Sequence, residues 1–146
     1  MKVEVKIDSD YKEPKVIVLT DKLTEEINEL VQKISQKAPH VIAGFRNDVL
    51  KILEPQQIYR IYAHAGKVYA VTENEEFSLR SRLYELEERL DKQTFARISN
   101  SEIINLKKVK YFDLNLVGTI QVLFVDGSST YVSRRYVSKI KQVLGV

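Results

Sequence analysis

From residue 41 onward the chain is a series of short apolar segments separated by turn residues, and one clear amphipathic helix interrupts them. Short segments in which apolar and polar side chains alternate are typical of half-buried β-strands. The pattern therefore predicts a mainly β domain with some α-helix. The expected strands cover residues 41–46, 49–53, 58–63, 67–72, 77–79, 95–105, 109–112, 118–125 and 129–132.

Residues 81–90 depart from the strand pattern. Leu83, Leu86 and Leu90 fall on one face of a helix, so this segment predicts an amphipathic helix that covers a sheet. Residues 134–144 predict a helical turn that closes the chain.

The first forty residues have a different pattern. Residues 2–8 alternate with a period of two, and residues 15–19 form a second short apolar run. We expect a small ββα extension in residues 1–40, before a domain in residues 41–146, and a helix end at Ala38-Pro39. An extension of this size needs a partner for its apolar surface, which predicts a dimerisation or partner-docking unit. The apolar stripe of its helix consists of Leu23, Ile27, Leu30, Val31 and Ile34.

The composition excludes several classes of function. The chain has 146 residues and no Cys, and its only imidazoles are His40 and His64, so we expect no metal site and no cofactor. The acidic run from Glu73 to Glu76 lies in a turn and the five glycines are isolated, so we expect neither an enzyme nor a small-molecule substrate. No apolar run reaches the roughly 18 residues of a membrane span, and no signal peptide is evident, which predicts a cytoplasmic protein.

Positive charge gathers near the C-terminus. The formal net charge is only +3, but residues 89–146 hold 10 Lys and Arg against 4 Asp and Glu. A local excess of cations attracts phosphate groups, which is the main source of affinity for DNA. The alternative is a solvated surface with an asymmetry that arose by chance.

Two segments in this basic region have the side chains that contact nucleic acids. Arg97, Ser99, Asn100 and Ser101 can bond base edges or phosphates, and the alternative is a polar turn in which Arg97 is an ion-pair partner. The pair Arg134-Arg135 follows an apolar strand, so at least one of the two guanidinium groups points outward.

The order and spacing of these segments resemble the LytTR family of bacterial DNA-binding domains, from about Ile42 to the C-terminus. The resemblance rests on the pattern F-x-R-x-x-x-S-x-I-x-N at 95–105, the helix before it, a later Asp-Gly turn, and the segment Val132-Ser133-Arg134-Arg135-Tyr136. It implies an elongated stack of small antiparallel sheets with one main helix, whose loops enter successive major grooves of DNA.

The resemblance also implies residue roles. The loop that holds Asn100 would enter a major groove, and the segment with Arg135 would supply a second contact loop. The hairpin with His64 and Lys67 would supply a third, and Lys139 would meet a phosphate or stabilise a helix end. Asn105 matches a position that we interpret as structural.

The function that follows is a stand-alone transcriptional regulator without a receiver domain. It would bind promoter direct repeats in double-stranded DNA as a homodimer or as paired monomers, and an inhibitory membrane protein could control it. The family usually has His-Arg or His-Lys where this chain has Ser99-Asn100. That departure keeps a second hypothesis open, a protein-interaction module on a LytTR-like scaffold that has lost strong DNA contact.

Overall fold

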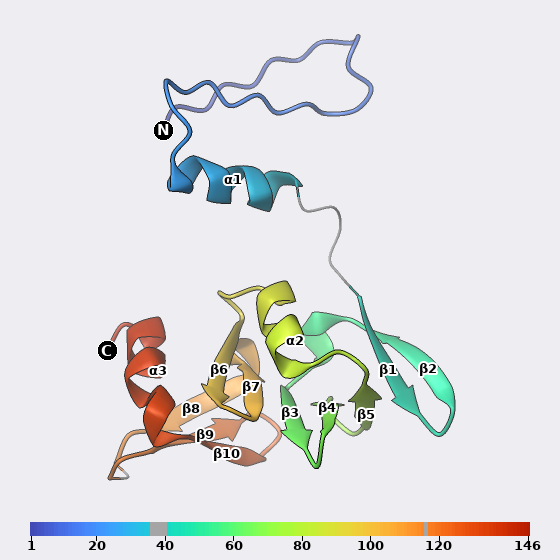
Figure 1. The fold of residues 1–146 in the computed structure, drawn as a ribbon, viewed down its shortest axis with the longest axis vertical. Helices are drawn as coiled ribbons and strands as arrows, with labels where there is room; N and C mark the ends of the chain where they lie inside the picture. The colour runs from blue at the N-terminus through green and yellow to red at the C-terminus, as the bar shows by residue number, and fades with distance from the viewer. Residues whose placement is uncertain (36–40, 116) are drawn as a thin grey trace. The chain divides into compact units, whose positions relative to one another are not determined.

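The protein is described from a computed structural model that covers residues 1–35, 41–115 and 117–146 (Figure 1). The chain divides into two compact units, Met1–Pro39 and His40–Val146. Each unit is considered by itself.

The mainly β prediction is confirmed, because the second unit is built from two antiparallel sheets. The larger sheet has seven strands in the order β2-β1-β5-β4-β3-β7-β6, and the smaller has three in the order β10-β9-β8. The segment predicted as one strand at 95–105 is a hairpin of two. The strands are β1 Ile42–Arg46, β2 Val49–Leu53, β3 Arg60–His64, β4 Lys67–Val71, β5 Glu76–Leu79, β6 Phe95–Ser99, β7 Glu102–Asn105, β8 Val109–Asp113, β9 Ile120–Phe124 and β10 Ser129–Val132.

Both helical segments predicted for this unit are present. α2 spans Leu83–Arg89, and its Leu83 and Leu86 are buried as the apolar stripe predicts. The C-terminal segment begins as the 3₁₀ turn η3, Arg134–Tyr136, and continues as α3, Val137–Leu144. Two further 3₁₀ turns connect strands, η1 at Pro55–Gln57 and η2 at Leu106–Lys108.

The hairpin of β6 and β7 lies between two hydrophobic cores and contributes side chains to both. Neighbouring residues of a strand point to opposite faces, and here both faces are buried. Phe95 and Ile103 pack in one core, which α2 covers. Ala96 and Ile104 pack in the other, together with Ile140 of α3. Because both cores hold this hairpin, the position of its turn is set by the whole unit.

The first unit corrects the ββα prediction. Its helix is present as α1, Glu25–Ser35, but residues 2–8 and 15–19 form no strand. Two extended runs without a third strand or a buried face lack stability of their own, and the apolar side chains of these runs are exposed or at most half-buried. The helix end expected at Ala38-Pro39 lies outside the described residues.

Candidate nucleic-acid interface

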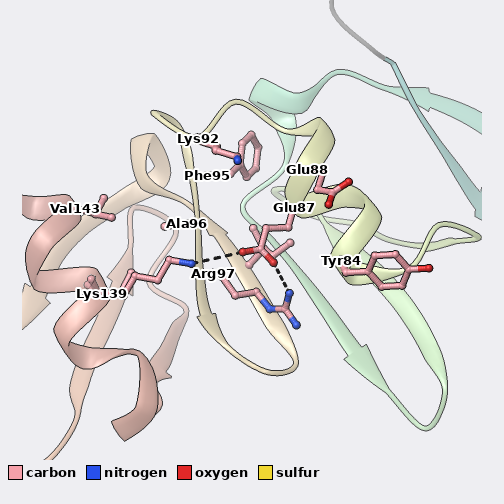
Figure 2. A pocket seen from close by; sticks show the side chains of 11 residues that line it. Tyr84, Glu87, Glu88, Lys92, Phe95, Ala96, Arg97, Lys139 and Val143 are labelled. Carbon is pink, nitrogen blue, oxygen red and sulfur yellow. Dashed lines mark hydrogen bonds and ion pairs between the residues drawn. The ribbon is translucent and has the colours of Figure 1, made fainter. Parts of the chain in front are cut away.

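The turn between β6 and β7 is held in shape by Arg97. Its Nε donates to the carbonyl of Ser99 at 2.7 Å, and its Nη2 donates to the carbonyl of Asn100 at 2.6 Å. Its Nη1 donates to Oε2 of Glu87 on α2 at 2.6 Å (Figure 2). The Arg97 side chain is only 13% exposed. A guanidinium has five N–H donors and three serve the protein here, so the first role of Arg97 is to brace the turn.

The two serines of this turn bond to each other. The backbone N–H of Ser101 donates to Oγ of Ser99 at 3.1 Å, and the two hydroxyl oxygens lie 3.3 Å apart. This is the local bonding expected of serines in a turn. The side chain that projects from the turn is therefore that of Asn100, which is exposed.

A hydrogen bond joins this turn to the segment with the paired arginines. The hydroxyl of Tyr136 donates to Oδ1 of Asn100 at 3.2 Å, and the N–H of Ser133 donates to the carbonyl of Ile98 at 2.9 Å. Because Tyr136 directly follows Arg135, the structure brings Asn100 and Arg135 to the same edge of the unit. With Oδ1 held by Tyr136, the Nδ2 amino group of Asn100 is the donor left to face a ligand.

Arg134 and Arg135 are both exposed. Arg134 lies over Gly118, where a Cβ would stand 3.1 Å from its Nε, and φ of Gly118 is +75°. The side chain of Arg135 makes no hydrogen bond or ion pair with any residue that the structure describes. The N–H groups of its guanidinium are thus available to a partner.

The hairpin of β3 and β4 ends beside the same turn. The N–H of Ala63 donates to the carbonyl of Ser101 at 2.8 Å. Ala65 and Gly66 have φ of 50° and 77°, as a two-residue turn with positive φ at both positions requires. His64 and Lys67 flank this turn as a cross-strand pair, and both are exposed. Three turns therefore meet at one edge of the unit.

Lys139 lies at the side of this edge. Its Nζ is 3.6 Å from Oε1 of Glu87 and 5.8 Å from the ring centroid of Tyr136. Figure 2 shows Glu87 between Lys139 and Arg97, in the cleft that α2 and α3 line. Glu87 partly neutralises both cations, while Lys139 keeps 54% of its side chain exposed.

Three residues of this arrangement have no local signal in the sequence. Tyr136 and Glu87 act on partners 36 and 10 positions away. The third is Glu102 of β7, whose carboxylate accepts from Arg60 Nη1 at 3.3 Å and from Thr130 Oγ1 at 3.1 Å, which links the two sheets. Burial raises the pKa of Glu102, against the lowering effects of Arg60 and Thr130.

The structural role predicted for Asn105 is confirmed. The side chain is 1% exposed, its Nδ2 donates to the carbonyl of Ile58 at 2.9 Å, and its Oδ1 accepts from the N–H of Lys107 at 2.9 Å. Asn105 thus fixes the end of β7 opposite to the turn that holds Asn100.

In the described parts of the chain, no three His, Asp or Glu side chains gather as metal ligands would. Within residues 1–35, 41–115 and 117–146, no helix combines the length and the apolarity of a bilayer span.

Comparison with known proteins gives one consistent result. The family model of the LytTr DNA-binding domain matches residues 48–145. Two relatives of similar length, from Staphylococcus aureus strains NCTC 8325 / PS 47 and bovine RF122/ET3-1, are each named an uncharacterized HTH-type transcriptional regulator. Each is 29% identical over 147 aligned positions, which cover 100% of this chain and 99% of the relative. A solved LytTr DNA-binding domain from Bacillus cereus has a similar fold, with a TM-score of 0.70 and 24% identity over 73% of this chain and 97% of that one.

Proposed function

This chain belongs to the LytTR family of DNA-binding domains, and we propose that it regulates transcription by reading double-stranded DNA with the three turns that meet at one edge of its second unit. The observation that carries the proposal is the hydrogen bond from Tyr136 to Asn100, which holds two of the turns together. The bond from Ala63 to Ser101 adds the third. Donors on three neighbouring turns can contact one duplex at the same time.

The donors differ in what they offer. The guanidinium N–H groups of Arg135 have no partner among the described residues and can donate to a guanine edge or a phosphate. The amino group of Asn100 can donate to a base acceptor in the major groove. Arg134, Lys67, His64 and Lys139 surround them and favour phosphate contacts, which position the protein without selecting a sequence. Arg97, Ser99 and Ser101 were predicted as contacts, and we assign them mainly to the shape of the turn. Arg135 and Asn100 are thus the proposed base contacts, whereas Arg97, Ser99 and Ser101 stabilise the turn that holds Asn100.

The preferred sites are direct repeats in promoters, bound in the cytoplasm by a dimer or by two adjacent monomers. A membrane protein that sequesters the regulator is a further part of this proposal. We propose no enzymatic activity.

One observation favours a second function. Ser99 and Asn100 occupy the positions where the family usually has His-Arg or His-Lys, so this turn brings less positive charge to DNA than is usual. A protein-interaction module on the same scaffold would tolerate that change. If the chain is such a module, any binding to DNA would depend only weakly on the salt concentration.

The variant Arg135→Ala tests the proposal. Binding of the full chain to promoter fragments upstream of its own gene is measured by fluorescence anisotropy at several salt concentrations. Loss of a bidentate base contact costs about 1–3 kcal/mol and relaxes the preference at one base pair. Equal loss for all sequences would reassign Arg135 to a phosphate contact, and no loss would remove it from the interface.

The matched control is Arg46→Ala. Arg46 is half exposed at the end of β1, and three strands separate β1 from β7 in the sheet. Because it removes the same charge far from the three turns, we expect affinity to change little. If the unmodified chain binds none of the promoter fragments at any salt concentration, the interaction module becomes the better proposal.

A further inference from the structure

The first unit has many exposed apolar side chains and, among its described residues, no core of its own. Nine of its large hydrophobic side chains are more than half exposed, and α1 has no buried residue. The nine are Met1, Val3, Val5, Ile7, Tyr11, Val16, Ile17, Leu19 and Leu23. A unit without an interior needs a partner to become stable, because short extended runs and one helix cannot hold together alone.

The backbone of residues 2–7 is also unpaired. A tight turn follows it, in which Tyr11 N donates to the carbonyl of Asp8 at 3.2 Å and Asp10 N donates to Oδ1 of Asp8 at 2.9 Å. Figure 1 shows this part of the chain as extended runs before α1. No hydrogen bond joins the backbone of residues 2–7 to another described residue. Open N–H and C=O groups in an extended segment are a template for a further strand.

The charges of this segment select a second copy of itself. In an antiparallel pair centred on Val5, Lys2 stands opposite Asp8 and Glu4 stands opposite Lys6, and the two-fold axis repeats both pairs. Every charged side chain then faces an opposite charge, and each such cross-strand pair is stabilising. On the other face, Val3 meets Ile7 and Val5 meets Val5.

Other arrangements place like charges together. A shift by two positions puts Lys2 opposite Lys6 and Glu4 opposite Glu4, or Glu4 opposite Asp8 and Lys6 opposite Lys6. A shift by one position moves the apolar side chains to the charged face. Parallel pairing in register sets each charge beside its own copy. One register is therefore favoured and its neighbours are penalised.

α1 has the same kind of self-complementarity. If each copy of α1 lies along the paired strands, a two-fold axis perpendicular to the strands makes the two copies of α1 run antiparallel to each other. Glu25, Glu26 and Glu29 lie toward the start of α1 and Lys33 lies in its last turn, so antiparallel helices bring opposite charges together. The apolar stripes of both helices can then cover the valine and isoleucine side chains of both strands.

We propose that the chain dimerises through antiparallel pairing of residues 2–8 with the same residues of a second copy, on a two-fold axis at Val5. The interface is isologous, so each copy contributes the same surface. The contact depends on the proposed function in one respect only, which is that the dimer is the form that binds DNA.

Charge exchange tests the register in the full chain. Glu4→Lys turns two attractive pairs into repulsive ones, so the dissociation constant of the dimer, from sedimentation equilibrium, should rise about tenfold. Glu4→Lys combined with Lys6→Glu restores opposite charges and should return the constant to about the original value. The control Glu13→Lys makes the same charge change at an exposed position outside the paired segment and should leave it unchanged.

A cysteine crosslink tests the axis, because the chain has no Cys of its own. Val5→Cys should form a disulfide-linked dimer under mild oxidation, whereas Val3→Cys should not, since its two copies lie four positions apart in the paired strands. A mixture of Val3→Cys and Ile7→Cys should crosslink to each other. A monomeric chain, no rescue by the double exchange, or equal crosslinking at positions 3 and 5 would overturn the proposal.

DNA binding separates the two proposals. The Glu4→Lys variant should bind DNA that holds a single half-site with the same affinity as the unmodified chain, because one copy of the protein is enough for one half-site. If both proteins fail to bind the half-site while the dimer data agree, the DNA proposal fails alone. If both bind it and the chain is monomeric, only the dimer proposal fails.

Discussion

In residues 60–64 and in residues 2–8 aliphatic side chains alternate with side chains that carry polar groups, yet only the first segment is a strand. As β3 it pairs with β4 and β7, and its Ile61 is fully buried. Residues 2–8 pair with none of the strands in the described parts of the chain, and the three apolar side chains among them are 81–98% exposed. Alternation therefore specifies which face of a segment can be buried, whereas a strand also needs neighbours that form hydrogen bonds with it and cover its apolar face.

The largest effect expected from this comparison is on stability. Ile103→Ala in β7 should lower the free energy of unfolding by about 2–5 kcal/mol, because it empties a fully packed site. Ile7→Ala removes the same atoms from a side chain that is 98% exposed and should leave the monomer unchanged. Urea denaturation followed by circular dichroism at low protein concentration measures both. Equal losses would mean that the first unit has a core after all.

The same contrast explains what the sequence could predict. Within the second unit each strand has neighbours, so local alternation and turn residues located the strands to within a few positions. The Ala65-Gly66 turn needs only local backbone geometry, and it too was predictable. In the first unit the alternation was equally clear, but the prediction of two strands was wrong because no residue that the structure describes pairs with them.

The candidate interface divides in the same way. Local spacing identified the exposed arginine pair and the polar turn with Asn100. It did not identify Tyr136 as the residue that joins them, because this contact depends on how two cores pack against the β6–β7 hairpin. Nor does local spacing identify Glu87 of α2 as the partner of Arg97 and Lys139. Contacts between distant segments require the fold before they can be seen.

The next effect concerns ion pairs in the two units. Arg97→Ala removes a partly buried pair and two bonds to the turn, and should cost about 1–3 kcal/mol of unfolding free energy. It should also weaken DNA binding, because Asn100 loses its fixed position. Lys2→Ala breaks a pair with Glu4 in which both side chains are mostly exposed, and it should leave the stability of the monomer unchanged. Thermal unfolding together with anisotropy distinguishes the two; a stable Arg97→Ala protein with normal DNA affinity would remove the bracing role.

A smaller effect is expected for single hydroxyl groups. Tyr136→Phe deletes the bond to Asn100 and should reduce DNA affinity by about 0.5–1.5 kcal/mol, with little change in stability because the bond is exposed. Tyr11→Phe in the first unit is the matched control, since Tyr11 is 59% exposed and far along the chain from the three turns. Unchanged affinity for Tyr136→Phe would show that the two turns keep their positions without this bond.

The smallest effect is a dependence of stability on pH at Glu102. Burial raises the pKa of its carboxyl above the ordinary 4.5, so the folded protein keeps this proton to a higher pH than the unfolded chain does. As pH rises through the ordinary value toward the folded one, the unfolded chain loses the proton first and the free energy of unfolding falls. Above that window the loss is complete.

Glu102→Gln removes this titration and keeps an oxygen that can accept from Arg60 and Thr130. Its free energy of unfolding, measured by urea denaturation between about pH 4 and pH 7, should therefore fall less with pH than that of the unmodified chain. Thr130→Val removes a hydrogen bond that lowers the pKa of Glu102, so the pKa in the folded protein should rise further. The pH range over which the free energy of unfolding falls should then become wider. Because Glu102 lies in β7, this pH dependence belongs to the second unit. An identical pH profile for the unmodified chain and Glu102→Gln would show that the buried carboxyl contributes nothing to it.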